Sequence, residues 1–478
     1  MTHGARPDHG LSTGTIGLTQ GVFQALTHMG PAAGVASSLL VAVSFAGAAT
    51  PLAVILTLVV VLLIGIAVGS LARVFSSAGG LAAYVEQVLG RRAGIFVSWL
   101  YAPLELLIAP IVFIFFGQFL SGALQSSLGI AVPWWVFAVL AAVFVCVVNV
   151  RGVKQSTTAG VVLGLAEVVI FVALAVWIIV AQWNDNTLAV LDPSRALDPG
   201  WSGIFKAVVF SILAFQGFET AAPLAEETRD PKRVIPRTIL YSALACGAFY
   251  LICSYAAVLG WGADRMGSFA SDASPWIVLA QRFWGPVWLL VLFALINSFL
   301  GNANAGTTAA SRIVFALGRA GRLPRRFAEV HPVHRTPTFS IYFQTVFGIV
   351  LTVVVGLLLG PTAAFSVIGA VITVFAIVIY IVTCAACIRY FTKEPRDRGF
   401  NVVLHVIVPA VAIVILLAPL WFQFVPWPDY PGNIGNAVAI LLIAVALVSA
   451  LLTGRRAPAG PSARIGDRDG EPVAKEPA

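Results

Sequence analysis

The chain has 478 residues, of which 59% are hydrophobic and only 10% are charged. Soluble domains carry about 25% charged residues, so this composition excludes a water-soluble globule and predicts a membrane protein. The net charge of +8 would suit a nucleic-acid partner, but the positions of the basic residues along the chain give it another explanation.

Apolar segments of about 20 residues, long enough to cross a bilayer as helices, follow one another through most of the chain. The predicted spans are 18–46, 51–73, 93–120, 132–150, 156–181, 203–226, 237–260, 284–312, 338–360, 363–388, 401–424 and 435–453. We therefore expect an all-α membrane protein with twelve transmembrane helices and a transmembrane domain over 16–455. The segment 1–15 is expected to be a cytoplasmic tail, and 456–478, rich in Pro, Gly and charge, a disordered cytoplasmic tail.

Lysine and arginine alternate between the two sides of the membrane if the N-terminus is placed in the cytoplasm. All but four of the 29 basic residues then fall on the inner side, and the exceptions are Arg195, Lys206, Arg265 and Arg282. Cytoplasmic loops carry an excess of Lys and Arg. The pattern predicts a multi-pass protein of the cytoplasmic membrane with both termini inside, and it explains the net charge without nucleic acid.

Two predicted spans, the first and the sixth, are interrupted near their middles. The interruptions are Gly30, Pro31, Ala32, Ala33 and Gly34 in the first span, and Phe215, Gln216, Gly217, Phe218 and Glu219 in the sixth. Backbone groups at membrane depth must be paired internally, so such a break is tolerated only where it is buried or lines a cavity. Breaks at corresponding places of two halves point to the substrate site of a secondary transporter with inverted repeats.

The chemistry of the two breaks suggests the kind of substrate. A half-helix beginning near Gly34 would offer backbone N–H groups to a carboxylate. Carbonyls freed near 216–219 would suit an ammonium group. A site that binds both a carboxylate and an ammonium group fits a zwitterionic amino acid. We therefore predict that the residues of both interruptions bind the substrate.

Three acids, Glu105, Glu167 and Glu219, lie close to the middle of predicted spans, and no Lys or Arg is as deep. A charge at the bilayer centre costs at least ~2.5–3.5 kcal/mol, so each is a candidate proton carrier or partner for a substrate amine. The alternative is a neutral carboxyl group that forms hydrogen bonds between helices.

Polar side chains also follow one face of the eighth span. Asn297, Gly301, Asn304, Thr308 and Ser311 recur at steps of four and three residues, and Thr307 lies beside them. Small and amide side chains commonly join membrane helices. The alternative is that Thr307, Thr308 and Ser311 bind a coupling cation.

Cysteine and histidine give no sign of a metal site or a cofactor. Cys384 and Cys387 have the spacing of a metal or redox motif but lie inside an apolar run, so we expect packing residues. His331 and His334 lie in a basic loop with no third ligand. His28 precedes the first break, where we expect a packed neutral side chain or, alternatively, a pH-sensitive group.

Several stretches in this order resemble the amino acid–polyamine–organocation (APC) superfamily of permeases over about 15–455. The motifs that carry the resemblance are Phe215 to Glu219, Glu226 to Arg237, Ser77 to Gly80 with Tyr84, Asn149 to Lys154, Ser311 with Arg312, Arg319 to Pro324, and Pro337. The resemblance implies a LeuT-type fold, a five-plus-five inverted repeat with broken helices one and six. It also implies alternating access and, commonly, proton coupling or exchange.

Four features of the sequence depart from the pattern of that superfamily. Gly-Pro-Ala-Ala-Gly at 30–34 replaces the usual Gly-x-Gly, Gln216 stands where an aliphatic residue is common, and Ala82 replaces a frequent Tyr. Glu167, fifteen residues after Gly152, occupies the position where some proton-coupled members place a lysine.

The sequence therefore predicts a permease that moves an amino acid or related amine, with the proton as coupling ion and the lipid bilayer as surroundings. A sodium-coupled symporter, an amino acid or polyamine exchanger, and a non-transporting sensor remain alternatives. Glu105 makes a polyamine conceivable, because an additional buried acid could meet a second amine. No zincin, P-loop or nucleophile-elbow motif indicates an enzyme.

Overall fold

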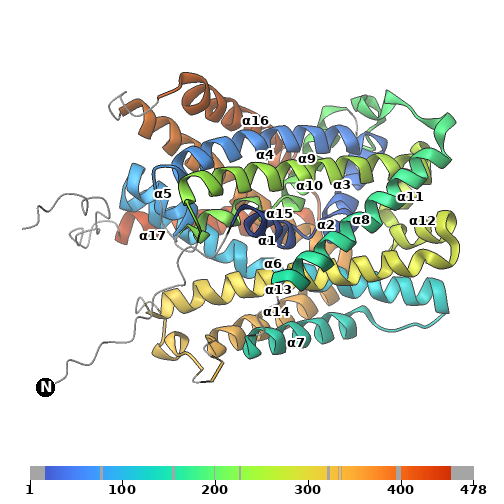
Figure 1. Cartoon of the computed structure of the whole chain (residues 1–478), viewed down its shortest axis with the longest axis horizontal. Helices are drawn as coiled ribbons and strands as arrows, with labels where there is room; N and C mark the ends of the chain where they lie inside the picture. Colours follow the sequence, from blue (N-terminus) through green and yellow to red (C-terminus); the bar gives the residue numbers. More distant parts are fainter. Residues whose placement is uncertain are drawn as a thin grey trace, which may run out of the picture.

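The computed structural model describes a bundle of helices whose long axes run roughly side by side (Figure 1). The residues described are 17–75, 79–152, 157–198, 200–225, 228–319, 323–331, 333–334, 336–393 and 400–453. All regular elements in these residues are helices, without a strand. The predicted tails over 1–15 and 456–478 lie outside them, as do parts of the motifs named above, such as Ser77, Lys154 and Glu226.

The longer helices account for most of the predicted spans. In chain order the elements are α1 (Leu18–Met29), α2 (Pro31–Ala36), α3 (Ser38–Ala46), α4 (Thr50–Ala72), α5 (Gly80–Leu89), α6 (Arg91–Leu128), α7 (Trp134–Arg151), α8 (Thr157–Ala181), α9 (Trp201–Ala214), the 3₁₀ helix η5 (Phe218–Leu224), α10 (Pro231–Trp261), α11 (Met266–Ser271), α12 (Pro275–Trp284), α13 (Trp288–Arg319), α14 (Thr338–Leu359), α15 (Pro361–Lys393), the π-helical turn η10 (Val403–Ile407), α16 (Val408–Phe424) and α17 (Gly432–Thr453).

Eleven helical stretches of the described chain are long and apolar enough to cross a membrane. The predicted first span is divided among α1, α2 and α3, and only α3, running on into α4, contributes to that count. Most other predicted bounds agree closely, for example 338–360 against Thr338–Leu359. Some helices run further than predicted, for example α6, which ends at Leu128 against 93–120, and α13, which ends at Arg319 against 284–312. The count of twelve spans and the inverted repeat stay predictions.

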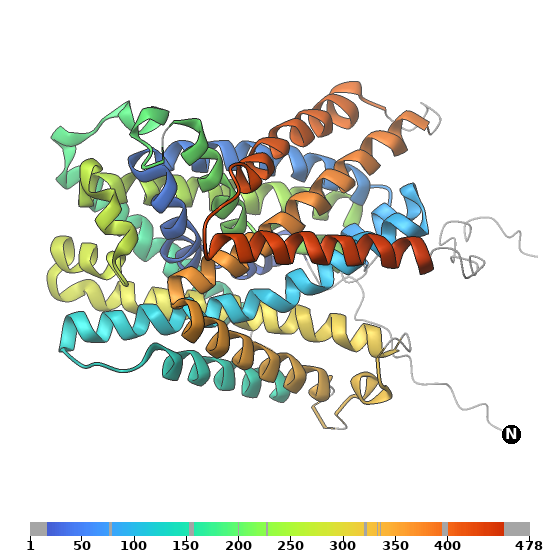
Figure 2. The same ribbon diagram turned by 180° about the vertical axis from the view of Figure 1, so that it is seen from behind.

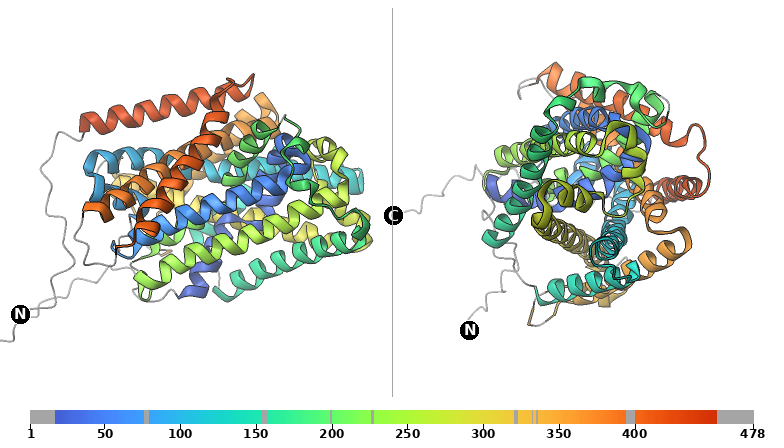
Figure 3. Two further views of the ribbon diagram at one scale, coloured as in Figure 1. Left: turned by 90° about the horizontal axis from the view of Figure 1, so that it is seen from above. Right: turned by 90° about the vertical axis from the view of Figure 1, so that its right-hand side faces the viewer.

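The broken segments lie inside the bundle, and uninterrupted helices surround them. α9 with its extension and α15 are mostly buried, whereas only about a quarter of the residues in the membrane-spanning stretches of α7, α8, α16 and α17 are buried. The end-on view in Figure 3 shows the helices arranged around the central segments, and Figure 2 shows α17 running along the opposite face. The segments that sequence analysis marked as interrupted thus lie in the core, together with α6, α10 and α15.

The outward faces of the peripheral helices are apolar. Large hydrophobic side chains such as Leu140 on α7, Trp177 on α8, Val414 on α16 and Leu441 on α17 are more than half exposed. Contiguous exposed apolar surface of this extent is typical of contact with lipid rather than water. Cys384 and Cys387 are buried free thiols within α15, which agrees with their expected packing role.

Candidate functional site

The first break is a single glycine rather than the five-residue interruption that the sequence suggested. Gly30 has φ +57° and ends α1, and α2 begins directly at Pro31, so Pro31 to Gly34 are helical. The predicted start of the half-helix near Gly34 was therefore three residues late. Proline is favoured at the first helical position because its fixed φ suits a helix and its missing N–H would be unpaired there.

A second interruption follows one and a half turns later and was not predicted. Ser37 has φ −120° and ψ −79° and separates α2 from α3. Its hydroxyl group donates a hydrogen bond to the carbonyl of Ala33 at 2.6 Å. The backbone N–H of Ser37 donates to the same carbonyl at 2.9 Å, and a serine hydroxyl that bonds a carbonyl four residues earlier often bends a helix.

The break in the sixth span begins after Ala214, where α9 ends, and the chain resumes as η5 at Phe218. Gly217 has φ +117°, and a Cβ atom there would lie 2.6 Å from Cδ2 of His28. Only glycine combines that backbone conformation with so close an approach. The two breaks are therefore in direct contact, with His28 of α1 packed on Gly217.

Side chains from other helices pair the carbonyl groups that the breaks release. Asn302 of α13 donates from Nδ2 to the carbonyls of His28 and Met29 at 2.9 and 3.2 Å. The hydroxyl of Tyr250 on α10 donates to the carbonyl of Ala214 at 2.7 Å. The last carbonyls of α1 and α9 would otherwise be unsatisfied, so α13 and α10 stabilise the broken conformation.

The N–H groups at the start of α2 are also paired, and this concerns Glu167. The carboxyl group of Glu167 on α8 accepts hydrogen bonds from Asn297 Nδ2 at 2.7 Å and from Ser298 Oγ at 3.0 Å, and it interacts electrostatically with the backbone N–H of Ala32. Ser298 Oγ in turn accepts from the N–H of Ala33 at 3.0 Å. Both N–H groups that the break exposes thus have partners within the protein.

Glu219 belongs to a separate network on the other side of the breaks. Its Oε1 lies 2.8 Å from the hydroxyl of Tyr380 on α15, and its Oε2 accepts from the N–H of Gly217 at 3.2 Å. The same Tyr380 hydroxyl lies 2.5 Å from Oε1 of Gln216. A tyrosine hydroxyl carries only one hydrogen, so it cannot donate to both oxygens.

Two arrangements of hydrogen atoms satisfy the hydrogen bonds among Glu219, Tyr380 and Gln216. In the first, a protonated Glu219 donates to Tyr380, which donates to the carbonyl oxygen of Gln216. In the second, Glu219 is ionised and accepts from Tyr380, while the Gln216 amide is turned so that its NH₂ group donates to Tyr380. The protonation of Glu219 and the orientation of the Gln216 amide are therefore linked through one hydroxyl group.

The third acid, Glu105 on α6, is buried and hydrogen-bonded to Tyr101, and its Oε2 has no partner among the described residues. It interacts electrostatically with Glu219, as does His28. None of the ion pairs in the described part of the chain involves Glu105, Glu167 or Glu219. The structure places Glu105 near enough to Glu219 for an electrostatic interaction, and it places Glu167 in a separate hydrogen-bond network.

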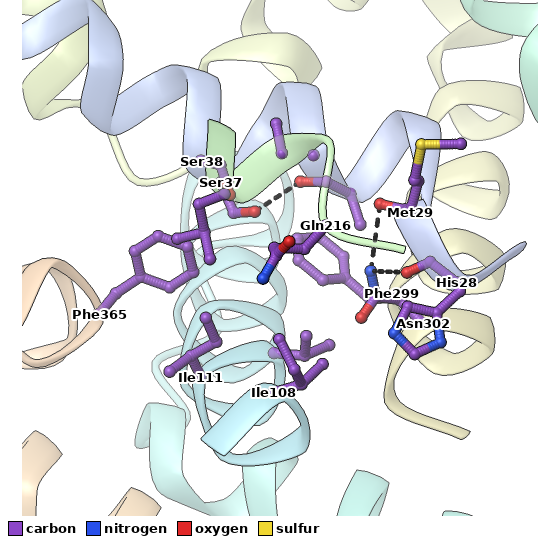
Figure 4. A pocket seen from close by; sticks show the side chains of 15 residues that line it. His28, Met29, Ser37, Ser38, Ile108, Ile111, Gln216, Phe299, Asn302 and Phe365 are labelled. Atoms are coloured by element: carbon purple, nitrogen blue, oxygen red, sulfur yellow. Dashed lines mark hydrogen bonds between the residues drawn. The ribbon is translucent and has the colours of Figure 1, made fainter. Parts of the chain in front are cut away.

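A small buried cavity of about 30 Å³ lies where the broken segments meet α6 and α13 (Figure 4). It holds roughly two waters at most, since one water needs about 10–15 Å³ by this measure. Of the residues predicted to bind substrate, Ala33, Gly34 and Gln216 line it, while Gly30, Pro31, Ala32, Phe215, Gly217, Phe218 and Glu219 do not. The rings of Phe215 and Phe218 pack instead on Tyr250 and Tyr380, at 5.1 and 5.6 Å between centroids.

Other lining residues escaped sequence analysis. Phe299 and Asn302 of α13 and Phe365 of α15 line the cavity, and Tyr380 joins Gln216 to Glu219. Asn302 lies next to the polar stripe but on another face of α13, so the stripe's spacing did not include it. The signal available for Tyr380 was a tyrosine near the middle of a long apolar run, which also contains Thr373 and Thr383.

The polar stripe of α13 mainly joins helices. Asn149 of α7 donates to Asn304 Oδ1 at 2.8 Å, and the hydroxyl of Thr308 contacts Asn149 Oδ1 at 2.8 Å and the carbonyl of Asn304 at 2.8 Å. Ser311 donates to the carbonyl of Thr308, and Thr307 is buried. These contacts favour the packing interpretation over a cation site.

Comparison of the sequence with known proteins finds similarity to permeases and other transporters. The sequence model described as amino acid permease matches residues 16–450. The chain is 26% identical over 298 residues to the low-affinity putrescine importer PlaP of Escherichia coli, a match that spans 61% of this chain but only 64% of that protein. It is 23% identical over 358 residues to the serine/threonine exchanger SteT of Bacillus subtilis, covering 73% and 77% of the two chains. It is also 28% identical over 362 residues to the uncharacterized amino acid permease YecA of Bacillus subtilis, covering 72% and 78%.

Proposed function

This chain belongs to the amino acid permease family, and we propose from that premise that it is a secondary transporter of an amino acid or related amine. The observation that carries the proposal is the contact between two broken segments, with Gly217 packed on His28, beside a buried cavity in the centre of the bundle. Discontinuous helices that meet at a buried site are typical of transporters that work by alternating access.

In this proposal the structure corresponds to a closed state of the transport cycle. The cavity of about 30 Å³ is too small for an amino acid, whose passage requires the segments around it to move apart. α1 to α3 and α9 with η5 form the first spans of two five-span repeats, and α16 and α17 follow the repeats. The twelve spans leave both termini in the cytoplasm, as the distribution of Lys and Arg favours.

We propose that the proton is the coupling ion and that Glu219 carries it. The hydrogen bonds at Tyr380 support this proposal. The protonated and the ionised forms of Glu219 each complete the hydrogen bonds of Tyr380 with a different orientation of the Gln216 amide. Gln216 lines the cavity. Protonation of Glu219 therefore changes the group that the protein presents to a substrate.

Three alternatives make different predictions. A sodium-coupled symporter needs a cation site, and the contacts of Thr308 and Ser311 with Asn149 and helix carbonyls speak against one there. An exchanger would need internal substrate for uptake. A non-transporting sensor would bind without flux. An enzymatic role has no support in the family or in the relatives, which are named as importers, exchangers and permeases.

The test is uptake of labelled amino acids and amines by purified protein in proteoliposomes, with a proton gradient and a sodium gradient imposed separately. We expect an inward proton gradient to drive accumulation and Glu219→Gln to abolish it. Accumulation that requires sodium would refute the coupling proposal, and binding without flux under either gradient would refute transport.

A further inference from the structure

We infer that the substrate is an organic amine without a carboxylate group, because the protein places its own carboxyl group, that of Glu167, where a substrate carboxylate would bind. This inference rests on the proposed transport function and narrows its substrate class. It departs from the sequence-based expectation of a zwitterionic amino acid.

The first step concerns the N–H groups at the start of α2. Pro31 has no N–H, and the N–H of Gly34 already donates to the carbonyl of Gly30 at 2.7 Å. That leaves Ala32 and Ala33. The N–H of Ala33 donates to Ser298 Oγ, which itself donates to Glu167, and the carboxyl group of Glu167 interacts electrostatically with the N–H of Ala32. A substrate carboxylate would have to displace Glu167, which would then lose its contacts with Asn297 and Ser298 as well.

The second step concerns the unpaired polar groups of the site. Asn302 Nδ2 donates to two carbonyls, which fixes the orientation of this amide and leaves its Oδ1 as a buried acceptor without a partner among the described residues. The other unpaired group is Nε2 of Gln216, a side chain only 5% exposed. Figure 4 shows both amides among the side chains around the cavity. Asn302 Oδ1 suits an ammonium group.

The third step concerns Gln216. When Glu219 is ionised, the network through Tyr380 is satisfied with the Gln216 amide turned, and its carbonyl oxygen then becomes the free group. The cavity would present two amide oxygens, from Gln216 and Asn302, to an ammonium group. The charged and titratable groups around Glu219 are His28, Tyr101, Glu105 and Tyr380, and the acids among them favour a cation.

The fourth step is the rest of the lining. Among the described residues, neither a Lys nor an Arg lines the cavity, and its remaining walls include Ile108, Ile111, Val112, Phe299 and Phe365. A carboxylate enclosed there would lack a cationic partner, and burying an unpaired charge is costly. An alkyl chain fits these walls, so the predicted substrate is a primary amine with an apolar chain.

The test compares amino acids with the amines formed by removing their carboxyl groups. Binding of leucine against 3-methylbutylamine, and of ornithine against putrescine, is measured with the purified protein in lipid nanodiscs, and each compound is also tested for exchange in proteoliposomes. We expect the amine of at least one pair to bind about tenfold or more tightly than its amino acid, as the cost of an unpaired buried group implies. The ornithine pair asks in addition whether a second ammonium group is accepted, with Glu105 as its partner.

Two variants test the role of Glu167 itself. Glu167→Ala frees the N–H of Ala32, and the preference for the amine should shrink because a carboxylate then finds a donor. Glu167→Gln keeps an acceptor for that N–H and should retain the preference. If Glu167→Ala fails to fold, the comparison of amine and amino acid binding by the wild-type protein alone tests the inference.

The outcomes separate this inference from the proposed function. Tighter binding and exchange of the amino acid in both wild-type pairs would overturn the inference and leave transport intact. An unchanged preference in folded Glu167→Ala would also overturn it. Binding of an amine or amino acid without any exchange would refute the proposed transport function instead.

Discussion

Replacement of Tyr380 by phenylalanine tests the link between Glu219 and the cavity. The change removes one hydroxyl group that lies 2.8 Å from Glu219 Oε1 and 2.5 Å from Gln216 Oε1. It leaves the ring, which packs on Phe218 at 5.6 Å. A hydrogen bond to a charged group contributes ~1.5–3 kcal/mol, and each 1.4 kcal/mol corresponds to a factor of about ten. We therefore expect proton-driven uptake to fall by roughly 10- to 150-fold.

The assay separates coupling from binding. Tyr380 does not line the cavity, so Tyr380→Phe should affect gradient-free exchange at saturating substrate much less than proton-driven accumulation. Tyr84 offers a matched control, because it is also fully buried and its hydroxyl has no partner among the described residues. Tyr84→Phe should leave both activities close to wild type. Proton-driven accumulation that survives Tyr380→Phe undiminished would refute the reasoning.

Two further predictions concern the first break and the polar stripe. Gly30→Ala should lower the melting temperature and abolish uptake, because positive φ costs ~1–2 kcal/mol and the new Cβ would lie 2.8 Å from Asn302 Nδ2. The control is Gly129→Ala, at φ +69° with no atom of the described residues within 4 Å of its new Cβ, which should have only the conformational cost. Equal losses of uptake in the two variants would contradict this account. Thr308→Ala removes a contact with Asn149 and should cost about 1 kcal/mol of stability, measured by thermal unfolding in detergent. Uptake should be identical in sodium and choline buffers. If wild-type uptake depends on sodium and Thr308→Ala loses that dependence, the cation-site interpretation is supported instead.

The sequence allowed the spans to be placed well because length and hydrophobicity alone determine whether a helix can cross a bilayer. Bounds such as 51–73 for Thr50–Ala72 differ by a single residue. The first span was harder. Gly30 indicated the break, but Pro31 begins a new helix and does not extend the interruption. Ser37 introduces a second break, which neither Gly nor Pro marks in the sequence.

The site itself was only partly predictable. The depths of Glu105, Glu167 and Glu219 followed from counting along the spans, and all three are buried. Their partners did not follow, because Tyr380 lies 161 residues from Glu219, and Ser298 131 residues from Glu167. Such contacts depend on how helices pack, which single-sequence periodicity does not reveal. The N–H groups at the first break were predicted to bind a substrate carboxylate, whereas in the structure Ser298 and Glu167 of the protein itself occupy that place.

The measurement that tests the central claim most directly is counterflow in proteoliposomes, because it needs no ion gradient. Vesicles loaded with unlabelled 3-methylbutylamine or putrescine are diluted into a trace of the same labelled amine, and the label inside is followed over time. The account predicts transient accumulation of label by wild-type protein and its loss in Gly30→Ala. Binding of the labelled amine in nanodiscs, with no accumulation above protein-free vesicles, would contradict transport through the broken-helix site.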